Sequence, residues 1–181
     1  MRYAQIRSMD ISNGEGVGVA LFVQGCHFHC YNCFNTETWD FNGGKTWESK
    51  IENKFFELIN KPFINRISIL GGEPLAEENI DNILNLINKI RVLFPKKRIW
   101  LYSGYTWDQI MYPIVTDDLN AERDRMIQNR IEIVSQCDVL IDGQFVDELK
   151  DITLKWRGSS NQRVIDVKKS LHQNKVILYC D

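Results

Sequence analysis

Three cysteines lie within eight residues, in the segment Cys26-His-Phe-His-Cys30-Tyr-Asn-Cys33. Cysteine thiolates are soft ligands that hold zinc ions and iron–sulfur clusters in proteins. The chain has five cysteines in all, and an odd number argues against a closed framework of disulfides. Cys137 and Cys180 lie alone in the sequence and are expected to be small buried or incidental residues. The cluster of three therefore predicts metal or redox chemistry.

Three kinds of centre are compatible with this cluster. A structural zinc site needs a fourth ligand, and His27 and His29 both lie inside the first interval between cysteines. An iron–sulfur cluster usually takes four cysteines, so a cubane held by three leaves one iron open to a ligand from outside the protein. A dithiol redox pair at Cys30 and Cys33 is the third alternative, and it leaves Cys26 without a role.

A second segment with chemical character is Gly71-Gly72-Glu73-Pro74. Two glycines allow the backbone to approach a ligand closely, and proline can begin a helix at about residue 75. Glu73 can accept hydrogen bonds from the ammonium group of a ligand. The glycine-rich segment 14–18 precedes a predicted strand instead of following one, so it is expected to be a turn and not a dinucleotide-binding loop.

The elements that must position these motifs alternate between strands and helices. Short apolar runs predict strands at 19–23, 67–70, 99–102 and 139–141, with a fifth at 176–179. Apolar residues at helical spacing predict helices at 47–60 and 77–94, and a polar helix is expected around 119–135. This alternation predicts an α/β fold with a mostly parallel sheet covered by helices.

Each of the first four predicted strands ends in a glycine-rich or polar turn. The cysteine cluster follows the first strand, and the other turns lie at 71–74, 103–105 and 142–145. Ligands gather at the carboxyl edge of a parallel sheet, although such turns also need glycine for purely structural reasons. The four turns together predict one site at this edge.

Composition limits the classes of function. The length of 181 residues suits one domain, 1–181, and 44% hydrophobic with 25% charged residues is ordinary for a globular protein. The net charge of −2 lacks the basic excess of a protein that binds nucleic acid or anionic membranes. Apolar runs reach only about five residues, against the ~20 that span a bilayer, and the N-terminus lacks the apolar core of a signal peptide. We expect a soluble cytoplasmic protein that binds neither nucleic acid nor membrane.

Cys-x3-Cys-x2-Cys after the first strand and Gly-Gly-Glu-Pro after the second together resemble the radical S-adenosylmethionine (SAM) enzymes. The chain is most similar to the activating enzymes of glycyl-radical enzymes, and among them to the family that activates anaerobic ribonucleoside-triphosphate reductase. The similarity extends over nearly the whole chain, in the segments 10–14, 21–26, 35–39, 71–75, 99–105, 140–145 and 156–162. The last of these, Trp-Arg-Gly-Ser-Ser-Asn-Gln, is the most specific to this family.

This resemblance implies that Cys26, Cys30 and Cys33 are catalytic residues that hold a [4Fe–4S] cluster, whose open iron binds SAM. The residues implied to contact SAM flank the cluster or follow the second strand: Asn32, Cys33, Phe34, Gly72 and Glu73. Reductive cleavage of SAM would give methionine and a 5′-deoxyadenosyl radical. That radical would take a hydrogen atom from a backbone glycine of the large subunit of the reductase.

The implied architecture is an incomplete TIM-type β/α barrel whose open side admits the glycine loop of the reductase. The implied electron donor is reduced flavodoxin or a similar protein. Asn32 stands where many radical SAM enzymes carry an aromatic residue, although small or polar residues also occur there in the reductase-activating family. The segment 112–136 is longer and more charged than the compact form of this family, and residues after Val164 extend past its usual end.

Two other functions stay open. The chain could activate another glycyl-radical enzyme, such as pyruvate formate-lyase, or it could be a non-enzymatic zinc-binding module that docks a partner. Arg157 either pairs with the SAM carboxylate or the reductase, or is a surface residue of a capped turn. The remaining candidates are expected to be polar loop or packing residues: His27, His29, Trp39, Trp47 and Trp100.

Overall fold

The computed structural model describes residues 1–113 and 121–180, and these residues form one sheet of eight strands. The strands are β1 (Arg2–Asp10), β2 (Gly18–Val23), β3 (Lys45–Thr46), β4 (Arg66–Gly71), β5 (Arg98–Tyr102), β6 (Val139–Asp142), β7 (Arg163–Asp166) and β8 (Leu178–Cys180). The helices are α1 (Ser49–Ile59), α2 (Glu77–Leu93), α3 (Trp107–Met111), α4 (Ala121–Gln136) and α5 (Val167–Gln173), with 3₁₀ turns at Thr36–Thr38 and Asp147–Leu149.

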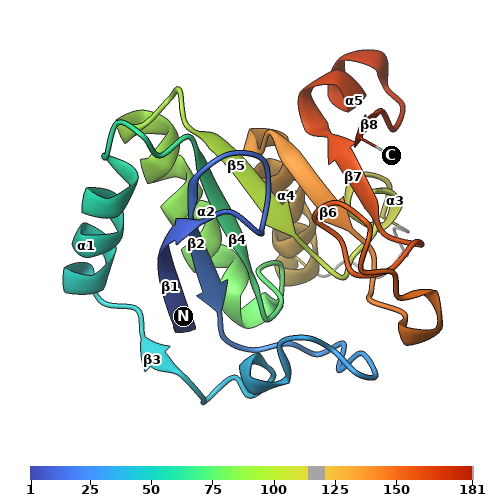
Figure 1. Ribbon diagram of the computed structural model, residues 1–181, viewed down its shortest axis with the longest axis horizontal. Coiled ribbons are helices and arrows are strands. Elements are labelled where there is room, and N and C mark those ends of the chain that lie inside the picture. Colours follow the sequence, from blue (N-terminus) through green and yellow to red (C-terminus); the bar gives the residue numbers. More distant parts are fainter. Residues whose placement is uncertain (114–120, 181) are drawn as a thin grey trace.

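The sheet is mixed, with strand order β3-β1-β2-β4-β5-β6-β7-β8 (Figure 1). Its four central strands, β2, β4, β5 and β6, are parallel to one another, and they are the first four strands that the apolar runs predict. The fifth, expected at 176–179, corresponds to β8 at the edge of the sheet. Antiparallel strands extend the sheet on both sides of this centre. The parallel arrangement that we expected therefore applies only to the centre. The incomplete β/α barrel and the single domain 1–181 stay predictions.

The predicted helices are present with small shifts in their ends. The helix expected at 47–60 is α1, the one expected at 77–94 is α2, and the polar one is α4. Residues 114–120 of the charged segment, including the first two positions of the expected polar helix, lie outside the described residues. Among the residues described, each helix is too short or too polar to span a lipid bilayer.

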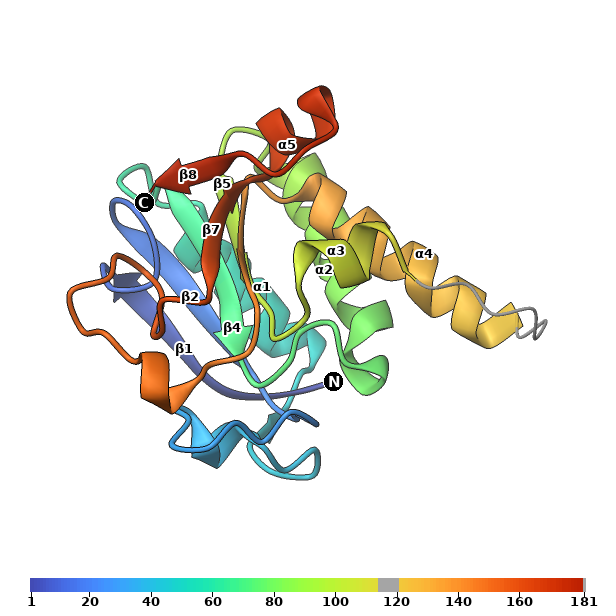
Figure 2. The same cartoon turned by 90° about the vertical axis from the view of Figure 1, so that its right-hand side faces the viewer.

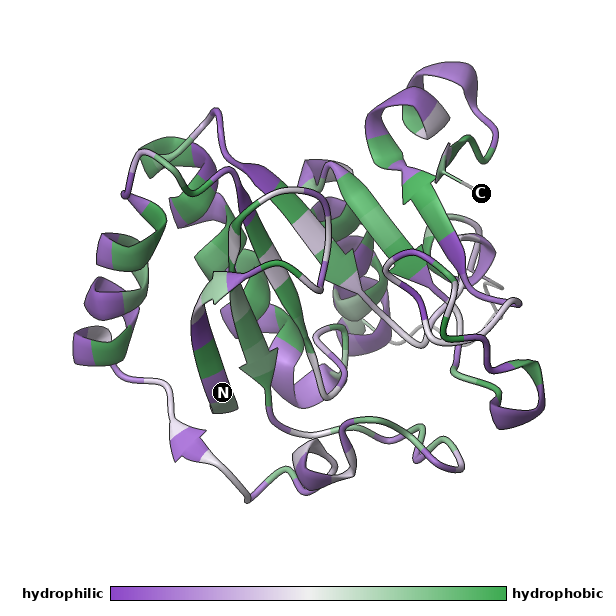
Figure 3. Ribbon diagram, viewed as in Figure 1, coloured by the Kyte–Doolittle hydropathy of each residue, from purple (hydrophilic) through white to green (hydrophobic). Residues whose placement is uncertain are grey.

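The main core lies between one face of the sheet and helices α1, α2 and α4 (Figure 2). Strand residues point alternately to opposite faces, so Ile69 and Leu101 enter this core while their neighbours Leu70 and Tyr102 point the other way. Colouring by hydropathy shows the central strands as mainly green, whereas the helices alternate between green and purple (Figure 3). The face opposite the helices carries the segments 11–17 and 143–162 (Figure 2).

A buried arginine holds the segment 11–17 against that face. Arg66 Nη2 lies 2.9 Å from Asp10 Oδ2, and neither side chain is more than 2% exposed. The same guanidinium donates to the backbone carbonyls of Asp10 and Asn13. A Cβ on Gly14, which has φ +131°, would lie 2.6 Å from Arg66 Cδ, so glycine is required where the turn crosses this side chain.

Candidate metal centre

A cavity of about 500 Å³ lies at the carboxyl ends of the central strands, on the face opposite the helices. It is lined by residues from the turns that follow all four parallel strands: Cys26, Cys30, Cys33, Gly71, Gly72, Glu73, Ser103, Gly104, Gly143, Gln144 and Phe145. The expectation that these turns meet at one site is therefore confirmed. Apolar side chains of the strands, Phe22 and Leu70, form part of its wall.

The three clustered cysteines are half-buried and all face this cavity. Burial raises the pKa of Cys26 to about 11 and also raises the pKa of Cys30. Burial therefore favours the protonated form of Cys26 and Cys30, and a metal that binds these two thiols must displace their protons. Across the described residues, no three side chains of His, Cys, Asp or Glu come close enough together to share one metal ion.

The three cysteines lie on one short loop and line one cavity. This arrangement fits an iron–sulfur cluster in which each thiolate binds a different iron. The backbone of this loop is folded tightly, because Cys33 N donates to Cys30 O at 3.1 Å. His27 and His29 do not line the cavity. His27 Nε2 instead lies 3.0 Å from Glu78, and the His29 ring packs on Trp39, so both are polar loop residues as expected.

Glu73 is fully buried, and its carboxylate joins two turns of the site. One oxygen accepts hydrogen bonds from Leu75 N (2.8 Å) and Ser103 Oγ (2.9 Å), and the other accepts from Gly104 N (2.7 Å). Burial raises the pKa of Glu73 to about 7, although these donors oppose the shift. The side chain therefore braces the turn after β4 against the turn after β5, and its contact with a ligand ammonium group stays a prediction.

Gly72 is required by a close approach of two backbones. Gly72 N donates to Val23 O at 2.9 Å, and Glu73 N donates to Gly25 O at 2.7 Å. A Cβ on Gly72 would lie 2.3 Å from Gly25 O. Sequence reasoning assigned this glycine to the approach of a ligand, whereas the structure shows that the cysteine-bearing segment already needs it.

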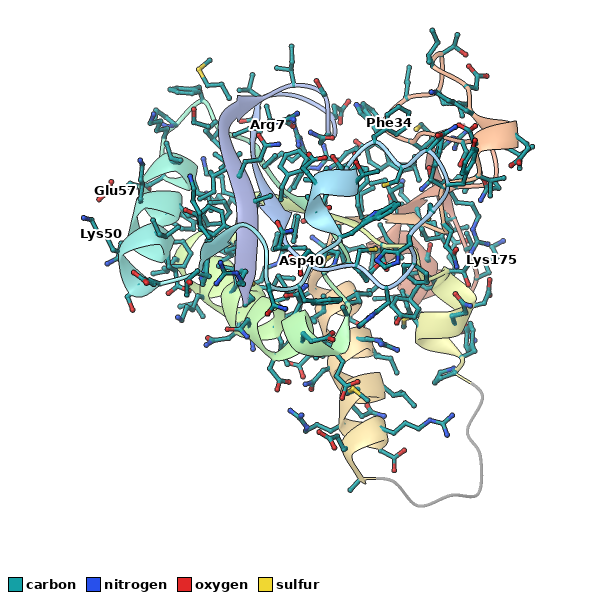
Figure 4. All side chains as sticks on the ribbon, turned by 90° about the horizontal axis from the view of Figure 1, so that it is seen from below. Arg7, Phe34, Asp40, Lys50, Glu57 and Lys175 are labelled. Carbon is teal, nitrogen blue, oxygen red and sulfur yellow. The ribbon has the colours of Figure 1, made fainter. Side chains whose placement is uncertain are left out.

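Phe34 and Asn32, the two neighbours of Cys33, are placed differently relative to the cavity. Phe34 is 59% exposed, lines the cavity and packs on Phe145, with 5.1 Å between ring centroids. Asn32 does not line the cavity, and its side-chain amide donates to Asp147. Figure 4 shows Phe34 and Arg7 on the side of the sheet away from α4.

The sequence did not identify Tyr102 and Arg7 as lining residues, and it left the role of Arg157 open. Tyr102 Oη is buried without a hydrogen-bond partner in the described structure, and so is Nε of Arg157, which sequence reasoning had left between two roles. Arg7 lies with its guanidinium 4.4 Å from the centre of the Phe22 ring, on another wall. Buried polar groups need partners, so Tyr102 Oη and Arg157 Nε are available to a ligand or to water. The position of Tyr102 directly before the turn at 103–105 was the signal that could have identified it.

Comparison with known proteins agrees with the cysteine chemistry. The model of a family described as a 4Fe-4S single cluster domain matches residues 12–165. Curated relatives named anaerobic ribonucleoside-triphosphate reductase-activating protein include that of Salmonella typhi, which is 40% identical over 166 residues, 91% of this chain and 97% of the relative. The protein of this name from Escherichia coli (strain K12) is 39% identical over 166 residues, with the same coverage. That of Enterobacteria phage T4 is 32% identical over 164 residues, 91% of this chain and 93% of the relative.

Proposed function

Since the chain belongs to the family of anaerobic ribonucleoside-triphosphate reductase-activating proteins and matches a 4Fe–4S single-cluster domain, we propose that it forms a glycyl radical on such a reductase. The observation that carries this proposal is the meeting of three cysteine thiols and the Gly-Gly-Glu-Pro turn around one cavity. The cavity opens at the edge of the sheet where parallel folds place their chemistry.

Cys26, Cys30 and Cys33 would hold a [4Fe–4S] cluster, and SAM would take the position at the iron that has no cysteine ligand. When reduced, such a cluster supplies the electron that cleaves SAM to methionine and a 5′-deoxyadenosyl radical, which abstracts a hydrogen atom from a backbone glycine of the reductase. The chain itself orients SAM and keeps water away from the radical.

The proposed contacts with SAM use the walls of the cavity. Gly72 and Glu73 would meet the amino end of SAM through the backbone of their turn, since the Glu73 carboxylate already has three donors. Phe34, together with Phe22 and Leu70, would exclude water from the reacting groups. Asn32 can reach SAM only if its amide leaves Asp147.

The proposed partners follow from the same chemistry. The glycine loop of the reductase large subunit would reach the cavity, and reduced flavodoxin or a similar protein would deliver the electron. A reaction between these partners would take place in the cytoplasm. Neither nucleic acid nor a membrane is part of this proposal.

The test is made on protein reconstituted anaerobically with iron and sulfide. We expect about four irons per chain and release of 5′-deoxyadenosine from SAM after addition of dithionite. Incubation with the reductase should then give the electron paramagnetic resonance signal of a glycyl radical. Protein that binds zinc alone, stays colourless and leaves SAM intact would support the zinc-binding module instead. Radical formation on pyruvate formate-lyase and not on the reductase would support the other activating role.

Replacement of one proposed cluster ligand tests its role, and replacement of a cysteine outside the cavity is the matched control. Cys30→Ala is expected to lose the cluster and all cleavage of SAM while the chain still folds, because Cys30 lies on a loop outside the main core. Cys180→Ala changes a half-buried cysteine that does not line the cavity and should retain both properties. Cleavage of SAM by the Cys30→Ala protein would exclude Cys30 as a ligand.

A further inference from the structure

Asn32 lies between the second and third clustered cysteines in an unusual backbone conformation. Its φ is +53°, in the left-handed region that asparagine tolerates better than most side chains. The backbone of this residue decides how the chain turns from Cys30 to Cys33. Whatever fixes Asn32 therefore also fixes the relative positions of these two thiols.

The side chain of Asn32 is held by a distant residue. Asn32 Nδ2 donates to Asp147 Oδ2 at 2.9 Å, across 115 positions of sequence. Asp147 begins the 3₁₀ turn Asp147–Leu149, which follows β6. The segment after the fourth parallel strand thus reaches back to the cysteine-bearing segment after the first.

A further contact joins the same segments. The Phe34 ring packs on Phe145 in an edge-to-face arrangement, with ring planes at 60°. Phe145 and Cys30 also line the same cavity. Hydrogen bonds to ligand sulfurs and other outer contacts stabilise and tune a metal centre. One side of the cysteine segment is therefore supported by residues 145–147.

We propose that Asp147 is a positioning residue, which through its hydrogen bond to Asn32 holds Cys30 and Cys33 in the arrangement that receives the cluster. We call this contact the Asn32–Asp147 latch. The identity of the centre rests on the proposed function, but the effect of the latch on the thiols does not. Asn32 thereby has a role other than the contact with SAM that the family resemblance implies.

The physical reason is preorganisation. A free loop loses conformational entropy when it binds a metal, and a loop that is already held in place loses less. The latch is also exposed to solvent, so breaking it leaves no buried group without a partner. A variant that lacks it should therefore fold normally and show its defect only in the cysteine segment.

The first experiment uses the iron-free chain and compares three variants with the wild type. Asp147→Ala removes the acceptor, Asp147→Asn keeps a carbonyl oxygen that can accept from Asn32, and Glu148→Ala changes the exposed neighbouring residue as a control. The rate of alkylation by iodoacetamide is measured at each cysteine by mass spectrometry. We expect Cys30 and Cys33 to react several-fold faster relative to Cys26 in Asp147→Ala, and at wild-type ratios in the other two variants.

The second experiment uses the reconstituted proteins and follows loss of iron to a chelator. Asp147→Ala should lose iron several-fold faster than the wild type, and its reduced cluster should give an altered electron paramagnetic resonance spectrum, with the thermal midpoint of the iron-free chain unchanged. Asp147→Asn should restore both properties. Equal alkylation ratios and equal iron loss in Asp147→Ala and wild type would overturn the latch, and so would failure of Asp147→Asn to restore either. If the wild type binds no iron, the proposed function fails while the alkylation ratios still test the latch.

Discussion

At the scale of single residues, the pKa of Glu73 is subject to two opposing effects. Its burial favours the protonated carboxyl, whereas the three donors around it favour the carboxylate. Burial is the larger effect and raises the pKa to about 7. The residue type was apparent in the sequence, but the direction of its side chain was not, because Ser103 and Gly104 belong to another turn.

The raised pKa of Glu73 predicts a pH-dependent stability. The folded chain keeps this proton up to about pH 7, whereas an unfolded chain releases it near pH 4.5, so the folded state binds more protons between these values. The contribution of Glu73 to the free energy of unfolding is therefore complete below pH 4.5 and is lost as the pH rises to about 7. The expected loss is about 3 kcal/mol, at about 1.4 kcal/mol for each pKa unit.

Urea unfolding of the iron-free chain between pH 4 and pH 8 measures this effect. Glu73→Gln cannot titrate, so the difference in unfolding free energy between wild type and this variant should fall as the pH rises. The variant also places an amide donor against Gly104 N–H, which adds a constant destabilisation of about 1–3 kcal/mol. A difference that is independent of pH would show that Glu73 has the same pKa in the folded and unfolded states.

At the scale of elements, the central strands and the long helices were predictable from local patterns. The four parallel strands are mostly apolar because both of their faces are covered. Strand β1 was missed because its sequence is polar and half-exposed, and only its pairing with β2 makes it a strand. Strand β7 and helices α3 and α5 were missed because they are short, so that tertiary contacts and not periodicity determine them.

The ion pair between β1 and β4 gives a prediction at this scale. Asp10→Ala should destabilise the chain by about 3–5 kcal/mol, because it leaves the buried Arg66 guanidinium without its counter-charge. The segment 11–17 should also become sensitive to proteolysis, since Asp10 binds Asn13 as well.

The matched control is the ion pair between α2 and α4. Arg125 Nη1 lies 2.8 Å from Asp81 Oδ2, but both side chains are more than half exposed. Asp81→Ala should therefore leave the free energy of unfolding nearly unchanged, since solvent screens this pair. Equal effects of Asp10→Ala and Asp81→Ala in chemical denaturation would contradict a structural role for the buried pair.

At the scale of the whole molecule, the end of the chain supports the wall of the cavity. Tyr179 of β8 packs on Trp100 and Trp156, with ring centroids 5.3 and 6.1 Å apart, and its hydroxyl contacts Arg98 and Glu15. Trp156 has φ +60° and directly precedes Arg157, which lines the cavity. Because a non-glycine residue keeps such a conformation only where its surroundings impose it, the C-terminal strand helps to place Arg157.

This arrangement predicts a remote effect on ligand binding. Tyr179→Ala should weaken the proposed binding of SAM by the reconstituted protein several-fold, because it removes the ring contact with Trp156 and the contact with Trp100, which itself packs on Trp156. Tyr179→Phe keeps the ring and leaves the Arg98–Glu15 ion pair intact, so its affinity should stay close to that of the wild type. Equilibrium dialysis with labelled SAM gives the dissociation constants. Leu178→Ala, at a partly exposed neighbour, is the control, and an equal loss of affinity in that variant would count against a specific role of Tyr179.

The separation of 115 positions between Asn32 and Asp147 also sets an order of events during translation. A ribosome adds about 5–20 residues per second, so the cysteines are made roughly 6–23 s before the segment that supports them. A factor that delivers iron to the nascent chain therefore meets an open segment. One that acts on the finished chain meets a segment that the contact between Asn32 and Asp147 already holds in place.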